Sequence, residues 1–121
     1  MTKARLRGLD TADWDSALKT HQESGLFGCY FQASIGLDDS HGADLFGFTA
    51  CNREWLERME DEGKSIPKLV IVDEVSFEAV ERAVLRVCAT VPDGTWAEMA
   101  SKLAEMMDWE FEGYVPLIGE E

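Results

Sequence analysis

The chain has 121 residues, which is the size of one domain, and 45% of them are hydrophobic. Eleven Lys and Arg stand against 24 Asp and Glu, so the formal net charge is −13 with neutral histidines. A surplus of this sign repels nucleic-acid phosphates and anionic membranes, and it argues against both as partners. We therefore predict a single folded domain over residues 1–121 with no nucleic-acid and no membrane partner.

The first half of the chain predicts three strands. Residues 4–9 alternate loosely and fit an edge strand, whereas residues 10–25 are weakly patterned and predict a loop or one short helical turn. Residues 27–35 alternate with period two, so that one face of this strand is apolar. After a turn segment at 36–43, residues 44–51 alternate in the same way, and the two strands predict an antiparallel hairpin.

The apolar faces of this hairpin also predict its register. A slip of one residue would exchange every side chain between the two faces of a strand. Pairing the apolar faces puts Cys29 and Cys51 on opposite sides of the sheet, whereas pairing the two cysteines would place Gly47 and Thr49 in the core. We therefore expect no disulfide here, and we interpret Cys29, Cys51 and Cys88 as buried thiols rather than nucleophiles.

The second half predicts helices and one short strand. Asn52 is a suitable cap for a helix, and residues 69–72 form a β-branched run that fits an inner strand. Ser76 is expected to cap a further helix, and Thr95 with Glu98 makes a capping box for the last one.

The tail at residues 109–115 alternates aromatic and acidic residues, and it could close the sheet or lie across it. The element order is β-β-β-α-β-α-α, followed by this tail. It predicts an α+β fold: a mostly antiparallel sheet of four or five strands with about three helices, the two C-terminal ones packed on one face.

No motif points to catalysis or to a bound cofactor. Neither of the two histidines, His21 and His41, has a partner at ligand spacing on a regular element. The loop at residues 38–41 offers oxygen and nitrogen ligands, but it lacks the spacing of a zinc or calcium site. We interpret it as a solvated turn and predict no enzyme, no metal and no cofactor. A small enzyme that uses this loop is the least favoured alternative.

The N-terminal sequence contains no apolar run of signal-peptide length, and no stretch approaches 18 apolar residues. The three cysteines are an odd number and include no CxxC pair. Both observations favour a reducing compartment, so we expect a cytoplasmic protein.

Acidic residues are concentrated towards the C-terminus. From Asp93 to Glu121, one lysine accompanies eight acids, which gives −7 over 29 residues, whereas the first twenty residues are close to neutral. Such a distribution suits an electrostatic binding face and speeds encounter with a basic protein. Charge that only maintains solubility is the alternative interpretation.

The candidate partner-binding residues are acids near the predicted hairpin loop and the C-terminal end, with one tryptophan as a possible anchor. They are Asp38, Asp39, Asp44, Glu105, Asp108, Trp109, Glu110 and Glu112. For Asp44 and Glu110 a structural role is an equal alternative: capping a strand or accepting hydrogen bonds from the backbone.

Several short motifs of this chain also occur together in one protein family. In chain order they are Ile35-Gly36, Gly42, Asp44-Leu45-Phe46, Trp55-Leu56, Trp96-Ala97-Glu98 and Trp109-Glu110-Phe111-Glu112-Gly113-Tyr114. With this combination the chain resembles the immunity protein 8 family of bacterial polymorphic toxin systems, over about residues 27–114. The closing Trp-Glu-Phe, with a tyrosine three residues further on, is the most specific of these motifs.

The resemblance implies a cytoplasmic protein that is made beside a toxin gene and protects the cell by binding the toxin domain. If that toxin is a nuclease, its substrate groove is basic, and a carboxylate-rich surface can occupy the groove or lie next to it. The rival interpretation is an acidic regulatory or scaffold domain that binds a host protein without any toxin. The oligomeric state is left open.

Overall fold

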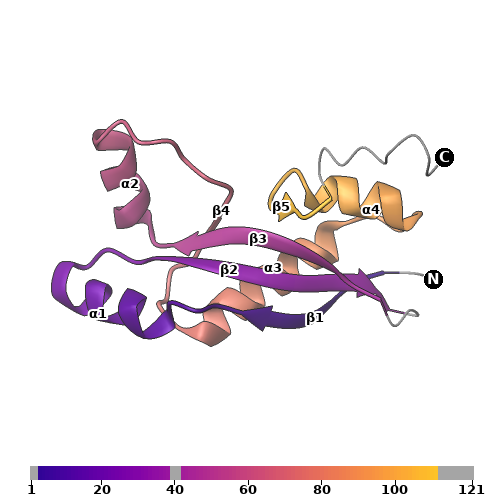
Figure 1. Ribbon diagram of the computed structural model, residues 1–121, viewed down its shortest axis with the longest axis horizontal. Helices are drawn as coiled ribbons and strands as arrows, with labels where there is room; N and C mark the ends of the chain where they lie inside the picture. The colour runs from indigo at the N-terminus through magenta and orange to yellow at the C-terminus, as the bar shows by residue number, and fades with distance from the viewer. Residues whose placement is uncertain (1–2, 39–41, 112–121) are drawn as a thin grey trace, which may run out of the picture.

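The computed structural model describes residues 3–38 and 42–111, which form one five-stranded sheet and four helices (Figure 1). The strands are β1 (Ala4–Asp10), β2 (Gly28–Leu37), β3 (Asp44–Cys51), β4 (Leu69–Ile71) and β5 (Asp108–Trp109). The helices are α1 (Trp14–Ser24), α2 (Arg53–Asp61), α3 (Phe77–Thr90) and α4 (Trp96–Leu103). The predicted α+β class is confirmed, with one helix more than expected.

The sheet has the order β1-β2-β3-β4, and β5 pairs with β3 as well. All pairs are antiparallel except β3 with β4, so the sheet is mostly antiparallel, as predicted. β4 lies beside residues 49–51 of β3 and β5 lies beside residues 46–47, along the same edge of that strand. The start of the C-terminal tail therefore joins the sheet as β5.

The prediction of an inner strand at residues 69–72 is wrong in position. β4 pairs with β3 alone, so within the described chain it lies at the edge of the sheet. Val70 and Val72 are buried, whereas Ile71 between them is exposed. The β-branched run therefore reflects burial of one face against the helices, and a strand with one buried face does not need a neighbour on both sides.

The hairpin of β2 and β3 has the predicted register. Cys29 lies opposite Ala50 and Phe31 opposite Phe48, and the two phenyl rings stack with centroids 5.6 Å apart. Cys51 lies opposite Gly28 and thus on the other face of the sheet from Cys29. All three cysteines are buried and free.

The thiols provide the first testable prediction. Burial raises the pKa of the Cys51 and Cys88 thiols from 9.0 to about 11. At pH 8 we expect native thiols to react with a disulfide reagent about 100-fold more slowly than thiols of the urea-unfolded chain, because the thiolate is the reactive form. Between pH 9 and 11 these two thiols ionise mainly in the unfolded chain. Their ionisation stabilises the unfolded state, so the free energy of unfolding should fall as the pH rises. Fast native labelling would contradict the described burial.

The core lies between one face of the sheet and the two C-terminal helices, which confirms that prediction. In Figure 1, α3 runs behind the strands. The fully buried side chains on the sheet side include Phe31, Ile35, Phe46 and Phe48, and those on the helix side include Val80, Val84, Met99 and Leu103. Apolar burial of this kind is the main source of the stability of the fold.

α1 corrects the expectation of a loop or a short turn at residues 10–25. Its sequence is polar, but Ala17 is buried and the Trp14 ring makes edge contacts with Phe27, Phe31 and Phe77 at centroid distances of 5.7–6.1 Å. These contacts come from distant parts of the chain, so tertiary packing holds a helix that local patterning does not reveal.

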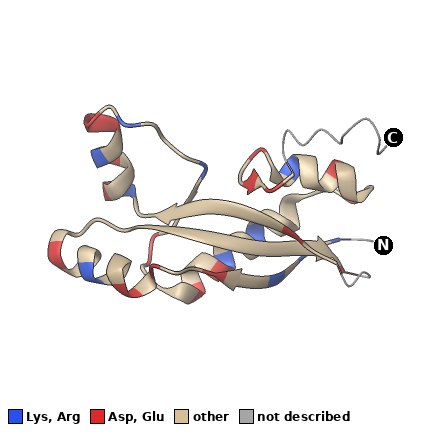
Figure 2. Cartoon of the chain, viewed as in Figure 1, with Lys and Arg blue, Asp and Glu red and all other residues tan. Residues whose placement is uncertain are grey.

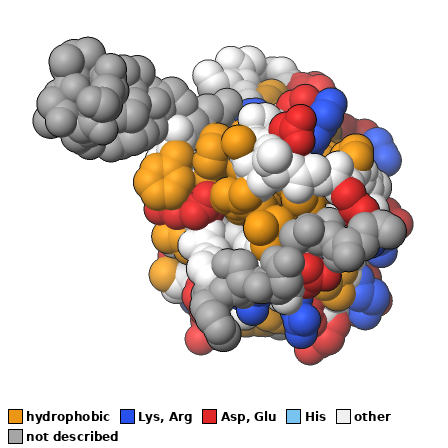
Figure 3. All heavy atoms as spheres, turned by 90° about the vertical axis from the view of Figure 1, so that its right-hand side faces the viewer, with side chains coloured by type: hydrophobic (Ala, Val, Ile, Leu, Met, Phe, Trp, Pro, Cys, Tyr) orange, Lys and Arg blue, Asp and Glu red, His pale blue; other side chains and the backbone are white. Residues whose placement is uncertain are grey.

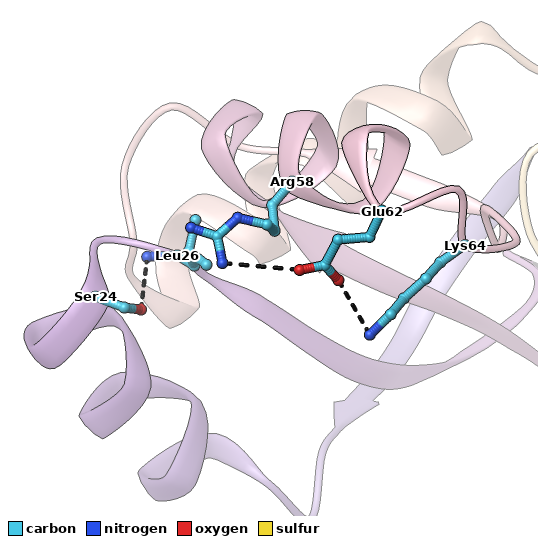
Figure 4. Close-up of polar contacts among 5 residues, drawn as sticks. All are labelled: Ser24, Leu26, Arg58, Glu62 and Lys64. Carbon is cyan, nitrogen blue, oxygen red and sulfur yellow. Dashed lines mark hydrogen bonds and ion pairs between the residues drawn. The ribbon is translucent and has the colours of Figure 1, made fainter.

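α2 rests on the opposite side of the sheet, at its end. None of the residues 53–61 is buried. Its Trp55 ring covers Gly28, where any Cβ would overlap the indole. At its C-terminal end Glu62 lies between Arg58 and Lys64, at 3.9 and 3.2 Å (Figure 4). These exposed ion pairs add little stability, although they neutralise part of the negative charge of α2.

Candidate partner-binding site

Asp44 is the first residue of β3, and its carboxylate ties three elements together. Its Oδ2 accepts a hydrogen bond from Nε1 of Trp96, at the start of α4, at 2.8 Å. The same oxygen accepts one from Nε1 of Trp109, in β5, at 3.0 Å. Bonds to an ionised acceptor are stronger than bonds between neutral groups, so this carboxylate fastens α4 and β5 to β3.

Aromatic contacts complete this cluster. The Phe46 ring meets Trp96 edge-on, with centroids 6.2 Å apart and an interplanar angle of 85°. The same ring stacks on Trp109, with centroids 6.2 Å apart and an interplanar angle of 9°. We call Asp44, Phe46, Trp96 and Trp109 the indole–carboxylate cluster. Its members come from three of the motifs that the sequence singled out, and they meet in space although they are far apart in the chain.

Glu110 continues the pairing of β5 with β3 by one residue. Its backbone N–H donates to the carbonyl oxygen of Leu45 at 3.0 Å, and its Oε2 accepts from the backbone N–H of Leu45 at 2.6 Å. The bond of the Glu110 carboxylate to the backbone is of the kind that its structural alternative requires. Asp44 also acts within the chain, but through two indole side chains instead of the backbone. Both carboxylates are thus engaged within the chain.

The other candidate residues differ in how accessible they are. Glu105, which follows α4, and Asp108, the first residue of β5, are exposed, and Glu105 lies 3.6 Å from Lys102. Asp108 has no ion pair within the described residues. Asp38 lies on the β1 side of the hairpin, where its Oδ1 accepts from the backbone N–H of Lys3 at 3.4 Å. Trp109 is half-buried, while Asp39 and Glu112 are outside the described residues.

The structure thus brings three of the candidate residues together around β3: Asp44, Trp109 and Glu110. Asp108 lies beside them in β5, whereas Asp38 lies on the β1 side of the hairpin. Carboxylates are not confined to this end, because α1, α2 and α3 carry them too (Figure 2). Figure 3 faces this end and shows hydrophobic side chains among acidic and basic ones. As far as the described residues go, this end of the molecule is therefore not purely acidic.

Sequence reasoning selected Asp44 and Trp109 but missed Trp96, the second indole that bonds to Asp44, and the phenyl ring of Phe46, which contacts both indoles. Both residues belong to motifs that the sequence singled out, Asp44-Leu45-Phe46 and Trp96-Ala97-Glu98. Asp44, however, is separated by 52 residues from Trp96 and by 65 residues from Trp109. Only the fold brings such distant residues together.

Metal binding, catalysis by the hairpin loop and membrane insertion were also considered for the described part of the chain. Residues 3–38 and 42–111 contain no group of three His, Cys, Asp or Glu that could hold a metal ion. The loop considered for a small enzyme lies mostly outside these residues. No described helix is long and apolar enough to cross a membrane.

A family model described as Immunity protein 8 matches residues 4–114. This range covers most of the chain, and it includes β1 and α1, which precede the motifs that carry the resemblance. All members of the indole–carboxylate cluster fall within it. No curated protein and no solved structure matches the chain.

Proposed function

The chain belongs to the immunity protein 8 family, and from this premise we propose that it binds and neutralises a cognate bacterial toxin domain by direct protein–protein contact. The family match over residues 4–114 is the observation that carries the proposal. The role requires a surface that fits the toxin and no catalytic group, and it places the protein in the cytoplasm, where the toxin would act.

We further propose that the toxin domain is basic. The net charge of −13 would attract such a partner over distances comparable to the Debye length, about 8–10 Å at physiological salt. Exposed carboxylates such as Glu105 and Asp108 then act at the rim of the contact, where charge mainly raises the association rate. A nuclease is one toxin with a suitable basic groove, which the immunity protein could occupy or obstruct from beside it.

The charge hypothesis is tested with the variant Glu105→Lys/Asp108→Lys. Its affinity for the toxin domain encoded by the neighbouring gene should fall about tenfold, and it should depend less on salt, because two attractive rim charges become repulsive. Isothermal titration calorimetry at about 0.05 and 0.3 M NaCl measures both effects.

The matched control is Glu78→Lys/Glu81→Lys, which makes the same change of charge at exposed positions of α3. It should lower affinity less than the Glu105/Asp108 variant does. Equal affinities and equal salt slopes for the two variants would refute a charged contact at the β5 side. Failure of the unsubstituted chain to bind the toxin domain, or to protect cells that express it, would refute the immunity function.

A further inference from the structure

Among the elements that the structure describes, none covers most of one face of the sheet with a helical layer. α3 and α4 pack on the face that carries Phe31 and Phe48, and α2 reaches the other face at Gly28. We call this second face, with the side chains of Tyr30, Gln32, Ser34, Leu45 and Thr49, the open face. Tyr30, Gln32 and Leu45 are exposed, and Ser34 and Thr49 are partly exposed.

The open face and its β4 edge expose large apolar side chains. Of the six exposed large hydrophobics in the described chain, Tyr30 (48%), Leu45 (37%) and Ile71 (41%) lie on this side of the sheet. The Tyr30 hydroxyl lies over Gly47, where any Cβ would overlap it. A tyrosine laid against a glycine on a rigid strand is already oriented for contact, and tyrosine is enriched at interface hot spots.

Carboxylates stand on both sides of this apolar centre. At the β1 side, Asp10 and Asp13 line a shallow hollow of about 440 Å³ together with Tyr30 and Gln32. At the β5 side, Asp108 lies opposite Gly47 and therefore shares the face of the sheet on which Tyr30 lies. An apolar centre with a polar, charged rim is the usual anatomy of a protein–protein interface.

We propose that the open face is the surface that receives the toxin domain, with Tyr30 and Leu45 at the centre and the carboxylates of Asp10, Asp13 and Asp108 at the rim. This inference rests on the proposed function. The expected occupant presents apolar side chains surrounded by Lys and Arg. A second copy of this chain fits less well, because each copy carries a net charge of −13 and acidic rims would face each other.

The indole–carboxylate cluster is a poorer candidate for the centre of the contact. The Asp44 carboxylate and both indole N–H groups are already hydrogen-bonded to one another. The Glu110 carboxylate is bonded to the backbone of Leu45. A partner that used these groups would have to break those bonds, whereas the side chains of Tyr30 and Leu45 contact it without rearrangement.

The test compares Tyr30→Ala/Leu45→Ala with Leu85→Ala by surface plasmon resonance, with the toxin domain encoded by the neighbouring gene as the probe. Leu85 is 48% exposed on α3, and it serves as the control for loss of an exposed apolar side chain. The double variant should bind about 100-fold more weakly, as expected for two interface anchors, and the control within about twofold of the unsubstituted chain. Thermal melts followed by circular dichroism verify that both variants are folded.

The possible outcomes distinguish an error in the proposed docking surface from an error in the proposed immunity function. If the unsubstituted chain and the folded double variant bind equally well, the open face is not the docking surface, although the immunity function stands. Binding lost only in Leu85→Ala would overturn the proposal in favour of α3. If size-exclusion chromatography shows a dimer that the double variant breaks without loss of toxin affinity, the open face joins two copies instead and the proposal fails. If the unsubstituted chain does not bind the toxin, the function itself is refuted.

Discussion

Asp44→Ala is expected to lower the free energy of unfolding by about 3 kcal/mol. The substitution removes the only acceptor recorded for two indole N–H groups, those of Trp96 and Trp109, within the described residues. Both indoles are half-buried, so water can restore only part of the lost hydrogen bonding. Urea unfolding followed by tryptophan fluorescence measures the loss.

Asp44→Asn is the matched control, because an amide oxygen can take the place of Oδ2 as a neutral acceptor. We expect it to cost about half as much as the alanine variant, since charge-assisted hydrogen bonds are roughly twice as strong as neutral ones. In the alanine variant, hydrogen exchange should also become faster at the backbone N–H of Glu110, because this group bonds to Leu45 where β5 is held against β3. If neither variant lowers the free energy of unfolding, the carboxylate does not hold α4 and β5 in place.

Asn52→Ala should cost about 3 kcal/mol as well, because it removes three hydrogen bonds at a buried site. Asn52 is the one buried polar or charged side chain among the described residues. Its Oδ1 accepts from the backbone N–H groups of Phe27 at 3.1 Å and Trp55 at 3.0 Å, and its Nδ2 donates to the carbonyl oxygen of Gly25 at 2.9 Å. The same side chain therefore caps α2 and fixes the chain between α1 and β2. Thermal and urea unfolding measure the loss.

Ser76→Ala separates the two tasks of Asn52. Ser76 caps α3 through a bond from the backbone N–H of Ala79, so its removal should cost about 1 kcal/mol, the usual value of a cap. The excess loss in Asn52→Ala then reports the bonds to Phe27 and Gly25. Equal losses in the two variants would mean that Asn52 is a helix cap and nothing more.

The matching of the apolar faces in the hairpin could be predicted because its information is local, although β2 continues to Leu37, two residues into the predicted turn. Bulky apolar side chains at alternate positions of β2 and β3 permit one register, and a slip would bury Gly47 and Thr49 in place of the phenyl rings. α1 could not be predicted, because Trp14 finds its partners on β2 and α3. Whether β4 has one neighbour or two depends on the path of the whole chain.

The candidate site, too, could be predicted only in part from the sequence. The chemistry of Asp44 and Glu110 narrowed their roles to interface or scaffold, but their bonding partners could not be predicted because they lie on other strands and helices. Tyr30 belongs to the polar face of its strand in the sequence pattern. Its exposure depends on which face the helices cover, so its candidacy for an interface could emerge only from the arrangement of the layers.

The two faces of the sheet have a consequence for how such a protein could be retargeted. Side chains on the open face make few contacts with the core, so they can be exchanged at little cost to stability. The indole–carboxylate cluster meanwhile keeps the framework intact. New toxin specificity could therefore be engineered by varying a handful of outward-pointing strand positions on an unchanged scaffold.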